Sequence, residues 1–115
     1  MNNLNSLIYF LKNSVIGFLY LNSISIIELK NLNQGELLFK TNCSVCHEGG
    51  NNIIIPEKNL KKEILEANGM NTISAISYQI TNGKNGMPAF GGRLIESEIE
   101  QISTYVLMES LKNFK

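Results

Sequence analysis

The chain is organised around Cys43-Ser44-Val45-Cys46-His47. Two cysteines three positions apart on a helical turn present their thiols on one side of it, next to the imidazole. Thiols at this spacing are suited to form thioethers with the vinyl groups of one haem, and the imidazole is then able to reach the iron. The motif uses both cysteines and the only histidine of the chain. It therefore predicts a covalent attachment site for one haem c.

Other uses of the motif are less compatible with the rest of the chain. A thioredoxin-like dithiol would require a βαβ context, which the sequence lacks. A zinc site would require a fourth ligand beyond two cysteines and one histidine. The remaining alternative is an accidental motif on a structural helix.

Residues 1–25 are predicted to be a cleaved signal peptide, with the cleavage position left open because no Ala-rich site is present. Lys12 precedes the apolar run 15–21, and the small residues Ser23 and Ser25 follow, as in secretory signals. An uncleaved anchor is the alternative, but Lys12 and Asn22 interrupt the roughly 20 apolar residues that a bilayer span needs. Residues 26–115 would form the mature domain, in a thylakoid lumen or a periplasm.

Composition excludes nucleic-acid binding, and chain length limits the size of the hydrophobic core. Ten basic residues balance ten acidic ones, and the formal charge is zero. No segment is basic enough to bind nucleic acid. The roughly 90 residues left after signal removal would bury only a small core. A covalently held haem would complete that core, so the apoprotein is expected to be largely unfolded.

The sequence predicts an all-α domain of about four short helices. The first is expected to begin at a capping box formed by Asn33 and Glu36 and to run into the haem motif. Gly35 and Phe39 share one face of this helix, where glycine permits a close crossing with another helix. Tyr105, beside the apolar stripe of the last helix, is expected to meet that face.

Proline, glycine and threonine mark the boundaries of the other helices. A second helix is expected over residues 57–68, after Pro56 and before a left-handed stop at Gly69. A third is expected between a Thr72 cap and Gly83, and a fourth from Ile95. The fourth carries an apolar stripe and a solvated acidic first turn; these are Ile95, Ile99, Ile102 and Val106, and Glu96, Glu98 and Glu100. The three isoleucines at 53–55 are expected to line the haem pocket rather than form a short buried strand.

The second axial iron ligand separates electron carriers from haem enzymes. The candidates are Met70, Met87, Met108, a lysine, or no protein ligand. Met87 is favoured because it lies in the glycine-rich loop 83–92, which is able to approach a flat ring closely and is stiffened by Pro88. Met108 is expected to fill a gap within the last helix, and Met70 lies at a helix junction. A His/Met pair would raise the reduction potential and close the iron to substrates.

Several further stretches follow the haem motif in an ordered set. They are Cys43-Ser-Val-Cys-His-Glu-Gly-Gly, Asn52, Pro56-Glu-Lys-Asn-Leu60, Tyr78-Gln79-Ile-Thr-Asn-Gly-Lys, Met87-Pro-Ala-Phe, Gly-Arg93-Leu and Tyr105-Val106. From about Gly35 to Val106 the chain resembles cytochrome c6, also called cytochrome c553, the small soluble c-type cytochromes of algae and cyanobacteria. The resemblance implies a class I cytochrome c fold around one covalently attached haem with its iron.

The resemblance also implies a function, which is electron transfer without enzyme activity. A carrier of this kind accepts an electron from cytochrome f of the cytochrome b6f complex and delivers it to photosystem I. The expected location is the thylakoid lumen, of a plastid by preference, with a bacterial periplasm as the alternative. The expected protein is a monomer that binds no nucleic acid and has no stable membrane insertion after signal removal. A related plastid form has an additional cysteine pair, which this chain lacks.

By the same resemblance, individual residues receive expected roles. Arg93 would contact partner proteins, although a solvated surface charge is the alternative. Gln79 would lie near the haem and tune its potential, and Lys58 would face a propionate. The haem and iron contacts would be made by Cys43, Cys46, His47 and Met87.

Two other functions remain open on the sequence. One is a periplasmic c-type cytochrome that donates electrons to a respiratory oxidase, because partner choice is set by surface charge. The other is a haem enzyme such as a peroxidase, which needs an open distal site with a catalytic acid or base. The chain has no second histidine to serve there, which disfavours the enzyme.

Overall fold

The structure, a computed structural model, describes residues 15–115, with side chains from Ser23 onward apart from Ile24. The first fourteen residues of the predicted signal peptide lie outside the described residues. The chain divides into two units, residues 1–31 and 32–115, and each is described by itself. Within the described part, no helix combines the length and the apolar character needed to cross a bilayer.

Helix α2 spans Val15–Asn42, so the first unit contributes helical residues 15–31 to it. The predicted start at Asn33 is therefore wrong. No proline or glycine occurs between residues 18 and 34, so the amide groups near Asn33 find carbonyl partners one turn upstream and need no cap. Glu36 accepts a hydrogen bond from Lys40 Nζ at 2.6 Å, rather than closing a capping box.

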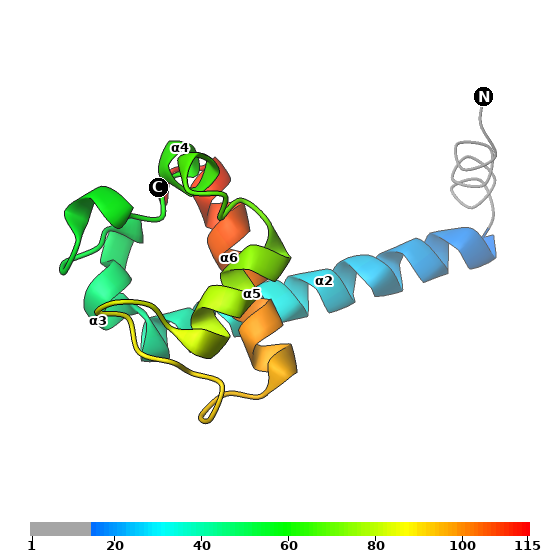
Figure 1. Cartoon of the computed structure of the whole chain (residues 1–115). Coiled ribbons are helices and arrows are strands. Elements are labelled where there is room, and N and C mark those ends of the chain that lie inside the picture. Colours follow the sequence, from blue (N-terminus) through cyan, green and yellow to red (C-terminus); the bar gives the residue numbers. More distant parts are fainter. Residues whose placement is uncertain (1–14) are drawn as a thin grey trace. The chain divides into compact units, whose positions relative to one another are not determined.

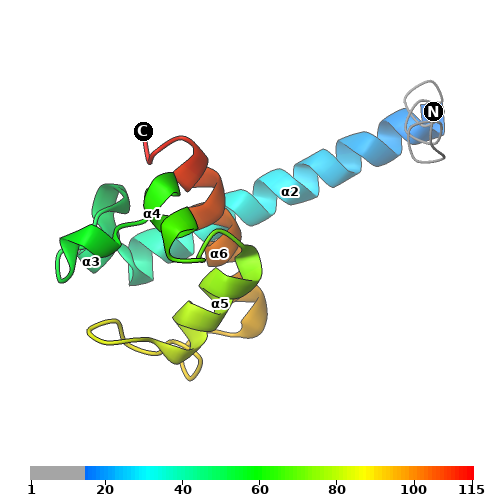
Figure 2. The same cartoon turned by 45° about the horizontal axis from the view of Figure 1, so that its top comes forward.

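In the second unit, the end of α2 crosses helix α6, Glu96–Leu111, at very short range (Figures 1 and 2). A Cβ on Gly35 would lie 2.3 Å from the carbonyl oxygen of Gln101 and 3.1 Å from Tyr105 Cβ. One turn later, the rings of Phe39 and Tyr105 have centroids 5.2 Å apart. The close crossing at Gly35 and the contact with Tyr105 are confirmed.

The haem motif forms its own helical turn directly after α2. Helix α3 spans Ser44–His47, and the backbone amides of Cys46 and His47 both donate to the carbonyl of Cys43, at 3.1 and 2.9 Å. The 3₁₀ helix η1, Glu48–Gly50, follows, and Gly49 and Gly50 turn the chain with φ of 62° and 76°.

The predicted helix over residues 57–68 is two shorter pieces. The 3₁₀ helix η2 spans Pro56–Lys58 and α4 spans Lys62–Ala67. Between them Asn59 is extended, and its side chain accepts from the amide of Lys61 at 3.0 Å and donates to the carbonyl of Pro56 at 3.2 Å. The break arises because asparagine offers the backbone these alternative partners. Gly69, with φ of 66°, ends α4 as predicted.

Helix α5 spans Ile73–Asn82, with the boundaries that the sequence predicts. Thr72 Oγ1 accepts from the amide of Ala75 at 3.1 Å, and Gly83 ends the helix with φ of 67°. Helices α5 and α6 lie side by side (Figure 1). Between them, the hydroxyls of Ser77 and the fully buried Ser103 are 2.9 Å apart.

The N-terminus of α6 differs in one detail from the prediction. The helix begins after Ile95, but the Ile95 side chain is 66% exposed, so the buried stripe starts one turn later at Ile99. Glu96 and Glu100 are exposed as expected. Glu98 is half-buried and accepts a hydrogen bond from the amide of Ile95 at 3.0 Å, which satisfies a free donor at the helix start.

A single core holds the second unit together. No β-strand occurs among residues 15–115, where the only β-type pairing is an isolated bridge between Lys84 and Met87. The all-α prediction is confirmed. The buried apolar side chains come from all four longer helices and the loop before α6, and they are Phe39, Leu65, Ile76, Ile80, Phe90, Ile99, Ile102 and Val106.

Candidate haem site

A cavity of about 410 Å³ opens within the second unit. Its walls come from the end of α2, from α3, α4, α5 and α6, and from the loops around them. Six of the seven predicted site residues line it, namely Cys43, Cys46, His47, Lys58, Gln79 and Met87. Arg93 does not line it.

The cavity suits a flat, mainly apolar group. Of the eight buried apolar core residues, all except Ile99 also line the cavity, so the core of the unit is the cavity wall. Cys43 and Cys46 are not joined in a disulfide. Burial, with a smaller contribution from Cys46, raises the pKa of the Cys43 thiol to about 11. Two free thiols beside an apolar cavity fit a haem that is bound through thioethers.

The imidazole of His47 is oriented by the loop that follows it. Its Nδ1 lies 2.8 Å from the carbonyl oxygen of Asn51. A carbonyl only accepts hydrogen bonds, so Nδ1 carries the proton. The other ring nitrogen, Nε2, then keeps a lone pair for a metal ion, which is the usual arrangement of a metal-binding histidine.

The loop after α5 holds Met87 in a tight turn. The amides and carbonyls of Lys84 and Met87 pair reciprocally, both at 3.0 Å, and Asn85 between them has φ of 53°. The turn folds back on Gly83, where a Cβ would lie 2.5 Å from the Met87 carbonyl oxygen. The glycine is therefore required twice, for its positive φ and for this close approach.

The side chain of Gln79 contacts the sulfur of Met87. Its Nε2 donates to Met87 Sδ over 3.7 Å, from the last turn of α5. The sequence places Gln79 near a haem by resemblance, without any indication of this contact. The hydrogen bond restrains the thioether from one side and lowers the electron density on its sulfur.

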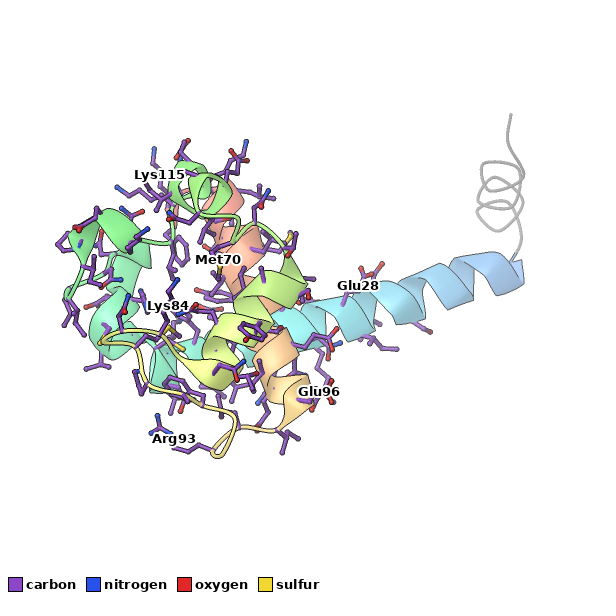
Figure 3. All side chains as sticks on the ribbon, viewed as in Figure 1. Glu28, Met70, Lys84, Arg93, Glu96 and Lys115 are labelled. Atoms are coloured by element: carbon purple, nitrogen blue, oxygen red, sulfur yellow. The ribbon has the colours of Figure 1, made fainter. Side chains whose placement is uncertain are left out.

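Met70 and Met108 are the other two candidate thioether ligands from the sequence. Met70, which follows α4, lines the cavity and packs against the core (Figure 3). Met108 is 46% exposed and does not line the cavity, so the expectation that it fills a gap is wrong. Position 108 falls on the solvent side of α6, two residues after the buried Val106. Met70 is therefore the other thioether of the cavity.

The segment between η1 and η2 shapes one wall. The side-chain oxygen of Asn52 accepts from the amides of Ile54 and Ile55 at 3.0 and 2.9 Å, and its nitrogen donates to the carbonyl of Lys58 at 3.0 Å. Ile54 and Ile55 line the cavity, but Ile53 is 68% exposed. The expectation for the isoleucines is confirmed for two and wrong for Ile53. Sequence reasoning missed the organising role of Asn52, because Asn-Asn reads only as a loop signal.

Lys58 and Asn68 meet beside the cavity, which both residues line. Lys58 Nζ donates to Asn68 Oδ1. A neutral amide leaves the ammonium charge uncompensated, so the lysine remains able to attract a carboxylate. Lys84 also lines the cavity (Figure 3). The sequence did not single out Asn68 or Lys84 as lining residues.

Arg93 lies one side chain away from the cavity. Its guanidinium carbon is 4.4 Å from the centroid of the Phe90 ring, and Phe90 is a buried lining residue. The Arg93 side chain is exposed and lies at the edge of the second unit in the view of Figure 3. A cation held over an aromatic face is partly immobilised but still accessible to solvent.

Comparisons with known proteins agree on a c-type cytochrome. Residues 30–106 match the family model described as cytochrome C oxidase, cbb3-type, subunit III. Cytochrome c6 of Bumilleriopsis filiformis is 62% identical over 80 residues, which cover 70% of this chain and 93% of that protein. Cytochrome c6 of Pyropia yezoensis is 52% identical over 101 residues, which cover 88% and 92% of the two chains.

A solved structure supports the same conclusion. Cytochrome c6 from the diatom Phaeodactylum tricornutum superposes with a TM-score of 0.69 at 46% identity, covering 71% of this chain and 97% of that one. The fold is that of a class I cytochrome c, and membership of this family implies one covalently bound haem c with its iron. The chain belongs to the cytochrome c6 family of electron carriers.

Proposed function

We propose that this protein carries electrons in photosynthesis, from cytochrome f of the cytochrome b6f complex to photosystem I, as a soluble monomer. The observation that carries the proposal is the convergence of His47 and Met87, forty positions apart in the chain, on one apolar cavity that also holds both cysteines. High identity to cytochromes c6 supports it further.

Each residue at the cavity has a proposed role. Cys43 and Cys46 would hold the haem through thioether sulfurs, and His47 Nε2 and Met87 Sδ would bind its iron. The haem supplies a one-electron couple between ferrous and ferric iron. With both side chains bound to the iron, the site would be closed to a substrate, and the thioether would favour the ferrous state.

Three further residues have proposed roles in setting the reduction potential, holding a haem propionate and docking partner proteins. We assign Gln79 to tuning the potential, through its hydrogen bond to Met87 Sδ. Lys58 is assigned to a haem propionate, because its ammonium donates to a neutral amide, that of Asn68, beside the cavity. Arg93 is assigned to partner docking, because it is exposed and lies against the lining residue Phe90. Lys58 and Arg93 would thus place positive charge close to the path of the electron.

The proposed location is a thylakoid lumen, of a plastid by preference, after removal of residues 1–25. Support comes from a relative's length, since 80 matched residues make up 93% of the Bumilleriopsis filiformis protein but only 70% of this chain. Mass spectrometry of the protein from its native membrane compartment tests the cleavage. A mature mass that still includes residues 1–25 would contradict it.

Electron transfer to purified photosystem I tests the function. We expect fast reduction after a flash, slowed by added salt, because steering between charged surfaces weakens as screening increases. An Arg93→Gln variant should lose part of the salt dependence, whereas Lys40→Gln, which removes a lysine paired with its helix neighbour Glu36, should retain it.

A respiratory function is the second candidate, and the cbb3-type name of the matching family model favours it. The same variants are therefore assayed with a purified cbb3-type oxidase. Slow, salt-independent reduction of photosystem I together with rapid transfer to the oxidase would replace the photosynthetic assignment with the respiratory one.

A further inference from the structure

The residues after α6 place an aromatic ring against the rest of the unit. Asn113 and Phe114 both have positive φ, 53° and 55°, and the amide of Phe114 donates to the carbonyl of Glu109 at 2.9 Å. A bulky residue rarely adopts this left-handed conformation, because its Cβ is crowded there. Surrounding contacts must therefore stabilise Phe114 in it.

Those contacts are with Gly50 and Phe39. A Cβ on Gly50 would lie 2.5 Å from Cδ2 and 2.7 Å from Cγ of Phe114, so the ring rests directly on the glycine backbone. The Phe39 and Phe114 ring centroids are 6.1 Å apart. The ring of Phe114 is thus in contact with η1 through Gly50 and with α2 through Phe39.

Gly50 belongs to the short segment that orients His47. Its carbonyl accepts from the amide of Leu60 at 2.7 Å, and the next carbonyl, that of Asn51, lies 2.8 Å from His47 Nδ1. Gly50 itself is buried, whereas Asn51 is exposed. The position of the Asn51 carbonyl therefore depends on how firmly the peptide of Gly50 is held.

We propose that Phe114 is a positioning residue for His47. Its ring presses on Gly50 and so fixes the Asn51 carbonyl that orients the imidazole. The inference rests on the proposed role of His47 as an iron ligand, but the contact between Phe114 and Gly50 stands independently of it. Loss of the ring should free the segment from Gly50 to Asn51 without opening the rest of the unit.

Hydrogen exchange in the ferrous holoprotein tests this inference. The reporters are the His47 Nδ1 proton and the Leu60 amide, and the reference is the amide of buried Phe90, which donates to Ile80 at 2.9 Å. Phe114→Ala should accelerate both reporters about tenfold relative to Phe90, because local opening no longer requires displacement of the ring. Phe114→Leu, which restores an apolar cover, should recover most of the protection.

A matched variant separates local from global effects. Ile99→Val lowers stability in a buried part of α6 that does not line the cavity, and it should accelerate reporters and reference equally. If Phe114→Ala does the same, or leaves the reporters unchanged, the inference is overturned. Should Phe114→Ala give no holoprotein, Phe114→Val is measured by the same ratio, and an unchanged ratio again overturns the inference.

The experiment also distinguishes this inference from the proposed function. A His47 ring proton without the large shift that an axial ligand experiences beside a haem would contradict the ligand role. The Leu60 amide still reports on the contact between Phe114 and Gly50 in that case. Faster Leu60 exchange with an unshifted histidine would therefore overturn the ligand assignment and keep the contact.

Discussion

Each proposed axial ligand is oriented by one hydrogen bond. His47 Nδ1 donates to the carbonyl of Asn51, and Met87 Sδ accepts from Gln79 Nε2. Partners of this kind tune a metal centre, because they change the electron density that the ligand offers. The two ligands are thus held by groups of opposite character, a carbonyl that draws on a ring proton and an amide donor that draws on a sulfur lone pair.

Replacing Met87 tests the thioether ligand. Met87→Ala should lower the reduction potential by roughly 0.1 V or more and open the iron to carbon monoxide, because axial ligands strongly shift haem potentials. Potentiometry and the absorption spectrum under carbon monoxide provide the measurements. Met108→Ala, at an exposed position outside the cavity, is the control. An unchanged potential with a retained thioether spectrum would redirect the assignment to Met70, the other methionine in the cavity.

Tyr105 makes a pH-dependent contribution to the free energy of unfolding. Burial first, and then Glu109 and Glu36, raise the pKa of its phenol above 10. The folded protein therefore keeps this proton where the unfolded chain has lost it, and the free energy of unfolding falls as pH rises through the folded pKa. Ultraviolet titration should show a tyrosine that ionises at higher pH than an ordinary phenol, and this transition should be lost in Tyr105→Phe. A titration identical in both proteins would contradict the shift.

Among the elements, the crossing of α2 and α6 brings two helices together without a side chain between them. The Gly35 backbone lies against the carbonyl of Gln101, and the tilted rings of Phe39 and Tyr105 are in contact one turn further along. Such an approach is possible only where one partner lacks a Cβ. The crossing thereby aligns the end of α2, from which the haem motif continues, with the helix that supplies the cavity residues Ile102 and Val106.

A methyl group at this crossing should destabilise the fold. Gly35→Ala gains about 1 kcal/mol of helix propensity, but its Cβ would lie 2.3 Å from backbone, and such overpacking typically costs about 1–3 kcal/mol. Because a backbone carbonyl cannot rotate away, we expect a net loss in urea unfolding of the holoprotein. Gln34→Ala, at an exposed neighbouring position, should show no such loss. Increased stability of Gly35→Ala would show that the helices separate easily.

For the second unit as a whole, the haem site and the hydrophobic core are one structure. Seven of the eight buried apolar residues line the cavity, so few core contacts exist apart from it. A domain of this size has little apolar surface in reserve. Cofactor attachment and folding should therefore be strongly linked.

Preventing haem attachment tests this linkage. A Cys43→Ser, Cys46→Ser double variant, purified without haem, should be largely unfolded, because its cavity walls would lack a packing partner. Far-ultraviolet circular dichroism and urea titration provide the measurement, with the holoprotein as reference. Native helix content with a cooperative transition in the haem-free protein would refute the prediction.

Local sequence signals predicted the features that depend on a few neighbouring residues. Thr72 and Gly83 bound α5 because a hydroxyl cap and a positive φ act within one turn. The haem motif is equally local, since the predicted attachment depends only on the spacing of Cys43 and Cys46 along one helical turn. The start of α2 was missed because Asn33 resembles a cap, whereas a longer run of helix-compatible residues precedes it.

Contacts between distant segments account for what the sequence left open. That Met70 lies in the cavity and Met108 outside it follows from how α4 and α6 pack, and that Ile53 faces solvent follows from the bonds of Asn52. The contact of Phe114 with Gly50 joins residues 64 positions apart. The sequence was thus sufficient for chemistry that resides in adjacent residues. Which side chains enclose the haem was settled by packing, because burial depends on the whole set of neighbours rather than on local pattern.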